Sequence, residues 1–128
     1  MLAAILESGD PERLYTGLSL LVSAASEGRP ARGLAMFGAL GPLLDPELEE
    51  RARTHARHVI EAERDAFART LAQLRDAASE LADCSIWACA AAVQATGADR
   101  ADVEARLAGI TSTPQFLRDN QGAQLVVV

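Results

Sequence analysis

Two cysteines, Cys84 and Cys89, are the residues of this 128-residue chain with the most reactive side chains. The apolar run 82–89 predicts a short buried strand, and the alanine-rich run 90–96 predicts a helix that Gly97 ends. We therefore expect Cys89 at the turn from strand to helix. The carboxyl edge of a parallel sheet and the unpaired N–H groups of a helix start both stabilise a thiolate at such a turn. The position favours a reactive thiol.

The spacing of the two cysteines predicts different roles for them. Five residues of strand separate Cys84 and Cys89 by roughly 16 Å and point them to opposite faces. A disulfide requires Cα atoms within about 7 Å, so the pair cannot close. Cys84 is expected to be a buried residue of the strand, and Cys89 a single thiol without a resolving partner. The residues alone leave open that Cys89 also only packs, because free cysteines are often buried.

Composition and charge exclude several classes of protein. The net charge is −6, and all twelve basic residues are arginines interspersed with acids, which argues against binding nucleic acid or anionic lipid. The start of the chain lacks the positive region that a signal peptide has, so we expect no signal peptide. The apolar run 34–44 is too short to span a membrane and is broken by glycines and a proline. Two cysteines outside any framework fit a reducing compartment. We expect a soluble, cytoplasmic protein with one domain, residues 1–128.

The first half of the chain predicts a strand, a helix and a second strand. Leu2 to Leu6 is an apolar run of strand length, and residues 7–11 then supply turn residues, an N-cap and a proline. The helix is expected from Pro11 to about Glu27, with Gly28 at its end. Residues 33–37 form the second expected strand. It leads into 38–44, which we expect to be an apolar loop that lines a pocket or a subunit contact.

The second half predicts a long helical segment and two further strands. Residues 46–79 have helical periodicity, with a break expected near 63–65 where Asp65 caps the second piece. His55 and His58 have a spacing that could hold a metal, but no third ligand is nearby, so we expect a solvated face and no metal. A polar helical turn over 99–106, a strand over 107–110 and a helix to Asn120 follow. The apolar end, 123–128, is expected to be a buried last strand.

This order of elements predicts an α/β fold, a three-layer α/β/α sandwich with a five-stranded, mainly parallel sheet. Ligands of such sheets bind outside the carboxyl ends of the strands. We expect that edge to carry Cys89, the N–H groups of Ala90 and Ala91, and further residues from three other segments. Those further residues are Ser8, Gly9, Gly38 and Thr111.

Motifs of other enzyme classes are missing or incomplete. No G-x-G-x-x-G follows the first strand and no G-K-[ST] occurs, so dinucleotide and P-loop sites lack their phosphate cradles and we expect no cofactor. The absence of C-x-x-C disfavours a thioredoxin-type dithiol. A Cys-His hydrolase would need a histidine within reach of Cys89, and both histidines lie on a charged segment. A thiol peroxidase would need a second cysteine within reach.

Four segments together resemble the DsrE/DsrF-like family of small sulfur-relay proteins. The first is Ile86-Trp87-Ala88-Cys89 with Gly97 eight residues after the cysteine, and the second is Leu107-Ala108-Gly109-Ile110. The other two are the opening 7–15, which is similar to the family's first turn and helix, and 36–43, which is similar to its apolar loop. The resemblance covers nearly the whole chain.

The resemblance implies a sulfur carrier. Members of this family hold sulfur as a persulfide on a cysteine at this turn, accept it from a donor protein, and pass it to an acceptor. By the motif, that cysteine here is Cys89. The family also implies a homo-oligomer, with a trimer or hexamer favoured and a dimer as the alternative. A competing hypothesis is a non-catalytic oligomeric binding or scaffold protein of the same fold, whose Cys89 would be slow to alkylate.

Overall fold

The computed structural model describes residues 1–128 and is built on one five-stranded sheet in which every pairing is parallel. The strand order is β4-β3-β2-β1-β5. The strands are β1 (Leu2–Leu6), β2 (Ala31–Ala35), β3 (Cys84–Cys89), β4 (Gly109–Thr111) and β5 (Gln124–Val127). The predicted fold class is confirmed, and the sheet is parallel throughout.

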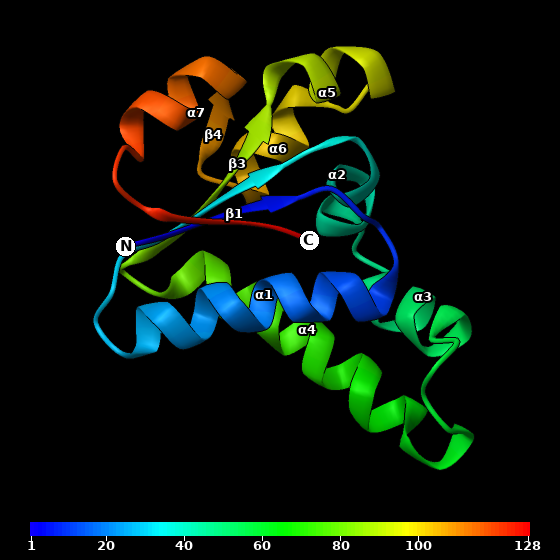
Figure 1. The fold of residues 1–128 in the computed structure, drawn as a ribbon. Coiled ribbons are helices and arrows are strands. Elements are labelled where there is room, and N and C mark those ends of the chain that lie inside the picture. Colours follow the sequence, from blue (N-terminus) through cyan, green and yellow to red (C-terminus); the bar gives the residue numbers. More distant parts are fainter.

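Helices cover both faces of this sheet. They are α1 (Pro11–Ser26), α2 (Phe37–Leu44), α3 (Leu48–His55), the 3₁₀ turn η1 (Glu61–Glu63), α4 (Arg64–Glu80), α5 (Ala90–Thr96), α6 (Arg100–Arg106) and α7 (Thr113–Asp119). Figure 1 shows α1 and α4 together below the sheet and α5, α6 and α7 above it. The chain therefore forms the three-layer sandwich that the sequence predicts.

One part of the core lies between the sheet and the layer of α1 and α4. Leu6 of β1 and three leucines of α1, Leu14, Leu18 and Leu21, are almost completely buried there. Gly17 allows the close approach of α1 to β1, because a Cβ at this position would collide with the Leu6 side chain. Burial of these leucines holds β1 against α1, and the end of β1 forms part of the carboxyl edge of the sheet.

Several helix boundaries lie at capping residues. The Asp10 side chain accepts a hydrogen bond from the Arg13 amide, and Gly28 follows α1 with a φ of 80°. Asp99 caps α6, and Ser112 caps α7 by accepting from the Gln115 amide. Gly97 ends α5 in the left-handed conformation, as expected.

The apolar segment 38–44 is not a loop, and this expectation was wrong. It belongs to α2, in which Ala39, Leu40 and Leu43 are at most 1% exposed. Their spacing places them on one helical face, so their burial favours a helix in spite of the glycines and Pro42. The buried face of this segment thus packs within the fold.

Three further boundaries differ from the expectation. The fourth strand is Gly109–Thr111 and not 107–110. The second strand is Ala31–Ala35 and not 33–37, because Arg32 joins the sheet and Met36 already begins the turn into α2. The long helix breaks at 56–60 and not at 63–65. Asp65 is no cap. Its carboxylate instead accepts a hydrogen bond of 2.6 Å from Arg53, which ties α3 to the first turn of α4.

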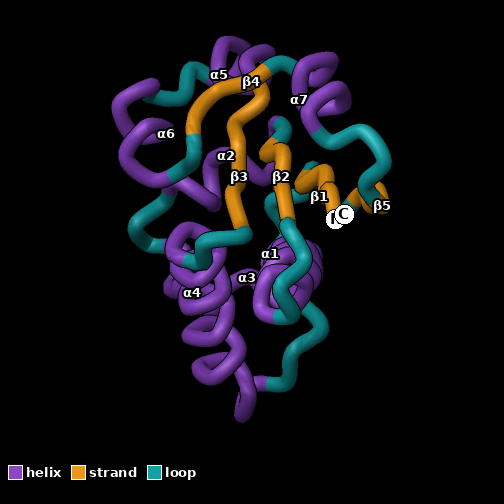
Figure 2. The backbone as a smooth tube through the Cα atoms, turned by 90° about the vertical axis from the view of Figure 1, so that its left-hand side faces the viewer, coloured by secondary structure: helices purple, strands orange, loops and turns teal.

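The last strand is not buried as expected. β5 is an edge strand that pairs only with β1, as Figure 2 shows. Leu125 and Val127 are 51% and 64% exposed. Both face the side of the sheet opposite α1, in register with Ala3 and Ile5. The apolar residues of 123–128 favour a strand, but no other part of the chain covers the side chains of Leu125 and Val127.

Candidate functional site

Cys89 ends β3 and is the N-cap residue of α5, the strand-to-helix turn that the sequence predicts. Thr111 of β4 is its direct partner in the sheet register. Its sulfur Sγ lies 3.8 Å from the hydroxyl Oγ1 of Thr113, close enough for a hydrogen bond to sulfur. Cys89 is only 2% exposed, whereas Thr113 lies on the surface. The thiol is thus held just below the start of α7.

The sulfur lies where two helices begin. Ala90 and Ala91 are the first two residues of α5, and their N–H groups have no partner within that helix. Thr113 is the first residue of α7, so the Sγ–Oγ1 contact joins Cys89 to that helix as well. The Cys89 side chain makes no hydrogen bond to the N–H groups of α5, so the Thr113 hydroxyl is its one polar contact.

The other predicted site residues form a separate contact. Ser8 Oγ accepts a hydrogen bond of 3.1 Å from the Asp10 amide, and Gly9 packs against the carbonyl oxygen of Gly38. A Cβ on Gly38 would lie 2.5 Å from the Glu7 carbonyl oxygen, so both glycines are needed for this packing. β2 lies between β1, which Ser8 and Gly9 follow, and β3, which carries Cys89. The structure therefore brings Thr111 to Cys89, but Ser8, Gly9 and Gly38 meet one another instead.

Cys84 has the surroundings of a packing residue. It lies at the other end of β3 and is 6% exposed, and both cysteines are free. Burial raises the pKa of the Cys84 thiol, and the positive charge of Arg32 offsets part of that increase. The raised pKa keeps Cys84 as a neutral thiol, which is the less nucleophilic form.

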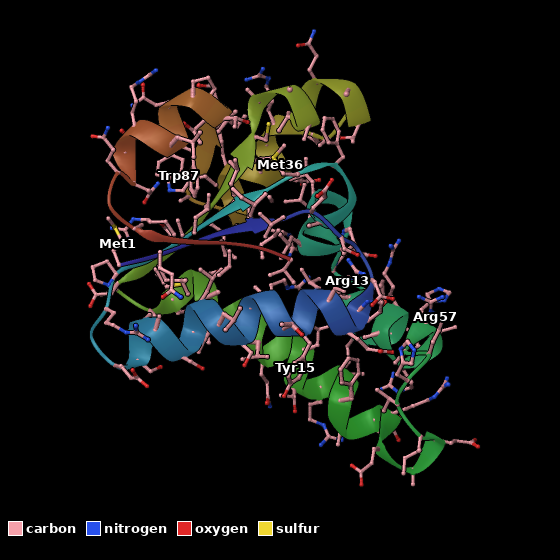
Figure 3. All side chains as sticks on the ribbon, viewed as in Figure 1. Met1, Arg13, Tyr15, Met36, Arg57 and Trp87 are labelled. Carbon is pink, nitrogen blue, oxygen red and sulfur yellow. The ribbon has the colours of Figure 1, made fainter.

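Cys89 lines none of the cavities of the structure. The cavity that includes its register partner Thr111 has a volume of about 120 Å³ and lies between α7 and the sheet. We call it the α7 cavity; it is lined by Arg32, Trp87, Thr111, Phe116, Asp119 and Asn120. Figure 3 shows Trp87 between α7 and the strands. Cys89 and Trp87 lie two residues apart on β3 and so point to the same face.

Sequence reasoning missed two residues of this region, Thr113 and Arg32. Local patterns predict only a helix start for Thr113, and aligning the end of β4 with the end of β3 is what places it near Cys89. Arg32 lies outside the predicted strand 33–37, and a charged residue is rare in a buried parallel strand. No periodicity signal marks either residue.

The two histidines do not meet. His55 ends α3, and His58 lies in the following turn, where its Nδ1 is 2.6 Å from Oε2 of Glu12. The backbone N–H of His58 also donates to Oε1 of Glu12, and this bond lowers the pKa of the carboxyl group. No group of three His, Cys, Asp or Glu side chains gathers anywhere in a geometry that could hold a metal ion.

No protein-family model matches the chain, and no curated protein is significantly similar to it. None of its helices combines the length and the apolar character that crossing a membrane requires. The function must therefore be argued from the site itself.

Proposed function

We propose that this protein carries sulfur as a persulfide on Cys89 and passes it between the thiols of a donor and an acceptor protein. The observation that supports this most is the position of Cys89 Sγ, at the start of α5 and beside the hydroxyl of Thr113. A thiolate or an anionic persulfide is stabilised by helix N–H groups and by a hydroxyl donor. The resemblance to sulfur-relay proteins predicts the same residue.

The transfer needs no cofactor and no net oxidation. The Cys89 thiolate attacks the outer sulfur of a donor persulfide, R–S–SH, and a new S–S bond forms on Cys89. The S–S bond of the donor breaks, its electron pair stays on the inner sulfur, and a proton gives R–SH. An acceptor thiolate then attacks the outer sulfur on Cys89 in the same way, which returns Cys89 to its starting state.

The fold limits how the sulfur of a partner protein can reach Cys89. The side chain is 2% exposed, and the start of α7 lies above it. A donor must therefore displace the Thr113 segment or present its sulfur between the starts of α5 and α7. Such gating protects a persulfide from free thiols, because the terminal sulfur would be shielded between transfers.

The proposal includes a homo-oligomer in a reducing compartment such as the cytoplasm, with a trimer or hexamer favoured over a dimer. Two free cysteines fit such a compartment. The exposed Leu125 and Val127 of β5 offer apolar area that a second copy would cover. The net charge of −6 argues against nucleic acid or an anionic membrane as the partner.

A second candidate is a non-catalytic oligomeric binding or scaffold protein. The observation that favours it is the burial of Cys89, which lines no cavity and would serve simply as a packing residue. The two proposals differ in the reactivity of this thiol. A scaffold cysteine would alkylate slowly in the folded protein and take up no sulfur.

The test is intact-mass measurement after incubation with a low-molecular-weight persulfide. We expect the wild type and Cys84→Ala to gain one sulfur atom that a reductant removes, and Cys89→Ser to gain none. Cys84→Ala is the matched control because it removes the other buried thiol of the same strand. Equal uptake by Cys89→Ser, or no uptake by any form, would refute the carrier proposal.

A further inference from the structure

Arg32 is the one charged residue on the five strands of the sheet. It lies on β2, between β1 and β3, and its side chain is half-buried. A guanidinium carries five N–H donors, all of which a ligand can use when the protein does not. Yet the Nη1 group of Arg32 donates only to two backbone carbonyl oxygens, those of Ala31 and Asp83, at 3.3 Å each.

No carboxylate pairs with Arg32, although one lines the same cavity. Asp119 lies at the rim of the α7 cavity, and no ion pair of the structure includes either residue. One carboxylate oxygen of Asp119 accepts a hydrogen bond of 2.6 Å from Gln115. Opposite charges thus face one cavity without joining, and a ligand with complementary charges could bridge them.

The remaining lining supplies an apolar wall and polar acceptors. The indole N–H of Trp87 already donates to Ser85, so its ring offers only apolar surface, as does the buried ring of Phe116. The side-chain amide of Asn120 donates to the Phe116 carbonyl, which leaves its own oxygen free to accept a bond. A positive group of a ligand in this cavity would find both Asp119 and Asn120 in its lining.

We propose that the α7 cavity binds a small α-amino acid as its zwitterion. The carboxylate binds the Arg32 guanidinium, the ammonium group binds Asp119 and Asn120, and the side chain lies along Trp87 and Phe116. A guanidinium pairs with a carboxylate through two parallel hydrogen bonds, which selects this group over a neutral one. This site is separate from the thiol chemistry of Cys89.

The volume of the cavity limits the size of the ligand. An apolar cavity of about 150 Å³ holds benzene, which has about six non-hydrogen atoms. The α7 cavity, at about 120 Å³, suits a ligand of similar or smaller size. Alanine and serine meet this limit, whereas leucine or phenylalanine would have to leave most of its side chain in solvent.

Isothermal titration of the full chain with alanine and serine tests the proposal, since neither amino acid carries a thiol. We expect saturable binding of both, and none of acetate or methylamine at equal concentration. Arg32→Gln and Asp119→Asn should each weaken binding tenfold or more, because each removes a charge-assisted hydrogen bond. Arg100→Gln, an exposed arginine of α6 outside the lining, should bind like the wild type.

Three outcomes would overturn the proposal: no saturable binding to the wild type, acetate binding as tight as alanine, or no effect of Asp119→Asn. The second outcome would show a simple anion site, and the third would show that the ammonium contact is absent. Should Arg32→Gln fail to fold, Asp119→Asn still decides, because Asp119 is exposed at the end of α7.

Discussion

The sulfur of Cys89 and the hydroxyl of Thr113 lie 3.8 Å apart, although 24 residues separate them in the sequence. A hydroxyl that donates to a thiolate stabilises its charge, so this contact links the start of α7 to the reactivity of Cys89. Thr113 also covers the sulfur from the solvent side. Substitution of Thr113 can separate the effect of its hydroxyl on the thiolate from the effect of its side chain as a cover.

Thr113→Val removes the hydroxyl and keeps the volume of the side chain. We expect alkylation of Cys89 at neutral pH to slow several-fold, because the thiolate loses a donor while the cover remains. The rate of iodoacetamide labelling, followed by mass, measures this effect. Thr96→Val is the control, because Thr96 Oγ1 donates to the Ala92 carbonyl of α5 and does not touch Cys89. An unchanged rate in Thr113→Val would show that the contact has no chemical role.

Replacement of the two close-packed glycines should destabilise the fold. A Cβ on Gly38 would lie 2.5 Å from the Glu7 carbonyl oxygen, and a Cβ on Gly9 would collide with the Gly38 carbonyl. Gly38→Ala and Gly9→Ala should each cost about 1–3 kcal/mol of unfolding free energy in urea titrations. Gly41→Ala, in the same helix as Gly38, meets nothing within 4 Å apart from its chain neighbours. Because Pro42 follows and disfavours a helical residue with a Cβ before it, we expect a change of less than about 1 kcal/mol. Equal stabilities of the three variants would contradict this packing.

The raised pKa of Cys84 predicts a dependence of stability on pH. Burial favours the neutral thiol, so the unfolded chain ionises first as the pH rises past the ordinary value of 9.0. The contribution of Cys84 is therefore complete below pH 9 and is lost above it. The stability of the wild type should fall between pH 8 and pH 10 more steeply than that of Cys84→Ala, as measured by urea unfolding. Parallel profiles would show that the thiol is not buried.

The contact between Glu12 and His58 should hold the turn at 56–60 against α1. Both carboxylate oxygens of Glu12 bind His58, at 2.7 Å to the backbone nitrogen and 2.6 Å to Nδ1. The pKa of Glu12 is lowered, so the contact is complete above the ordinary value of 4.5 and is lost as the pH falls through the lower folded value. Glu12→Ala should speed hydrogen exchange at the His58 amide, whereas Glu63→Ala should not. Equal protection in the two variants would contradict the contact.

The sequence predicts the strands, caps and layers well because each is a local signal. Asp10, Gly28 and Ser112 mark helix boundaries through their own side chains or backbone, and β3 with α5 follows from an apolar run and a glycine. Local signals also explain the place of Cys89. Local signals fail in α2, where the glycines and the proline predict a loop. The chain forms a helix there because side chains such as Leu40 become buried.

The surroundings of Cys89 were harder to predict because they depend on non-local register. Thr111 was expected near Cys89 and is its partner, whereas Ser8 and Gly9 lie beyond β2. The strand order cannot be inferred from the sequence, and it is this order that places Thr111 beside Cys89 and places Ser8 and Gly9 two strands away. Arg32 shows the same limit, since its cavity forms only when α7 lies across the sheet.

Mapping the added sulfur to one residue tests the carrier proposal most directly. No arginine or lysine lies between the two cysteines, so trypsin leaves both on one peptide, 76–100, and fragment masses must distinguish them. After incubation of the wild type with a persulfide donor, we predict one added sulfur atom on the fragments that contain Cys89 and none on those with Cys84 alone. Added sulfur on Cys84, or on neither cysteine, would contradict the account.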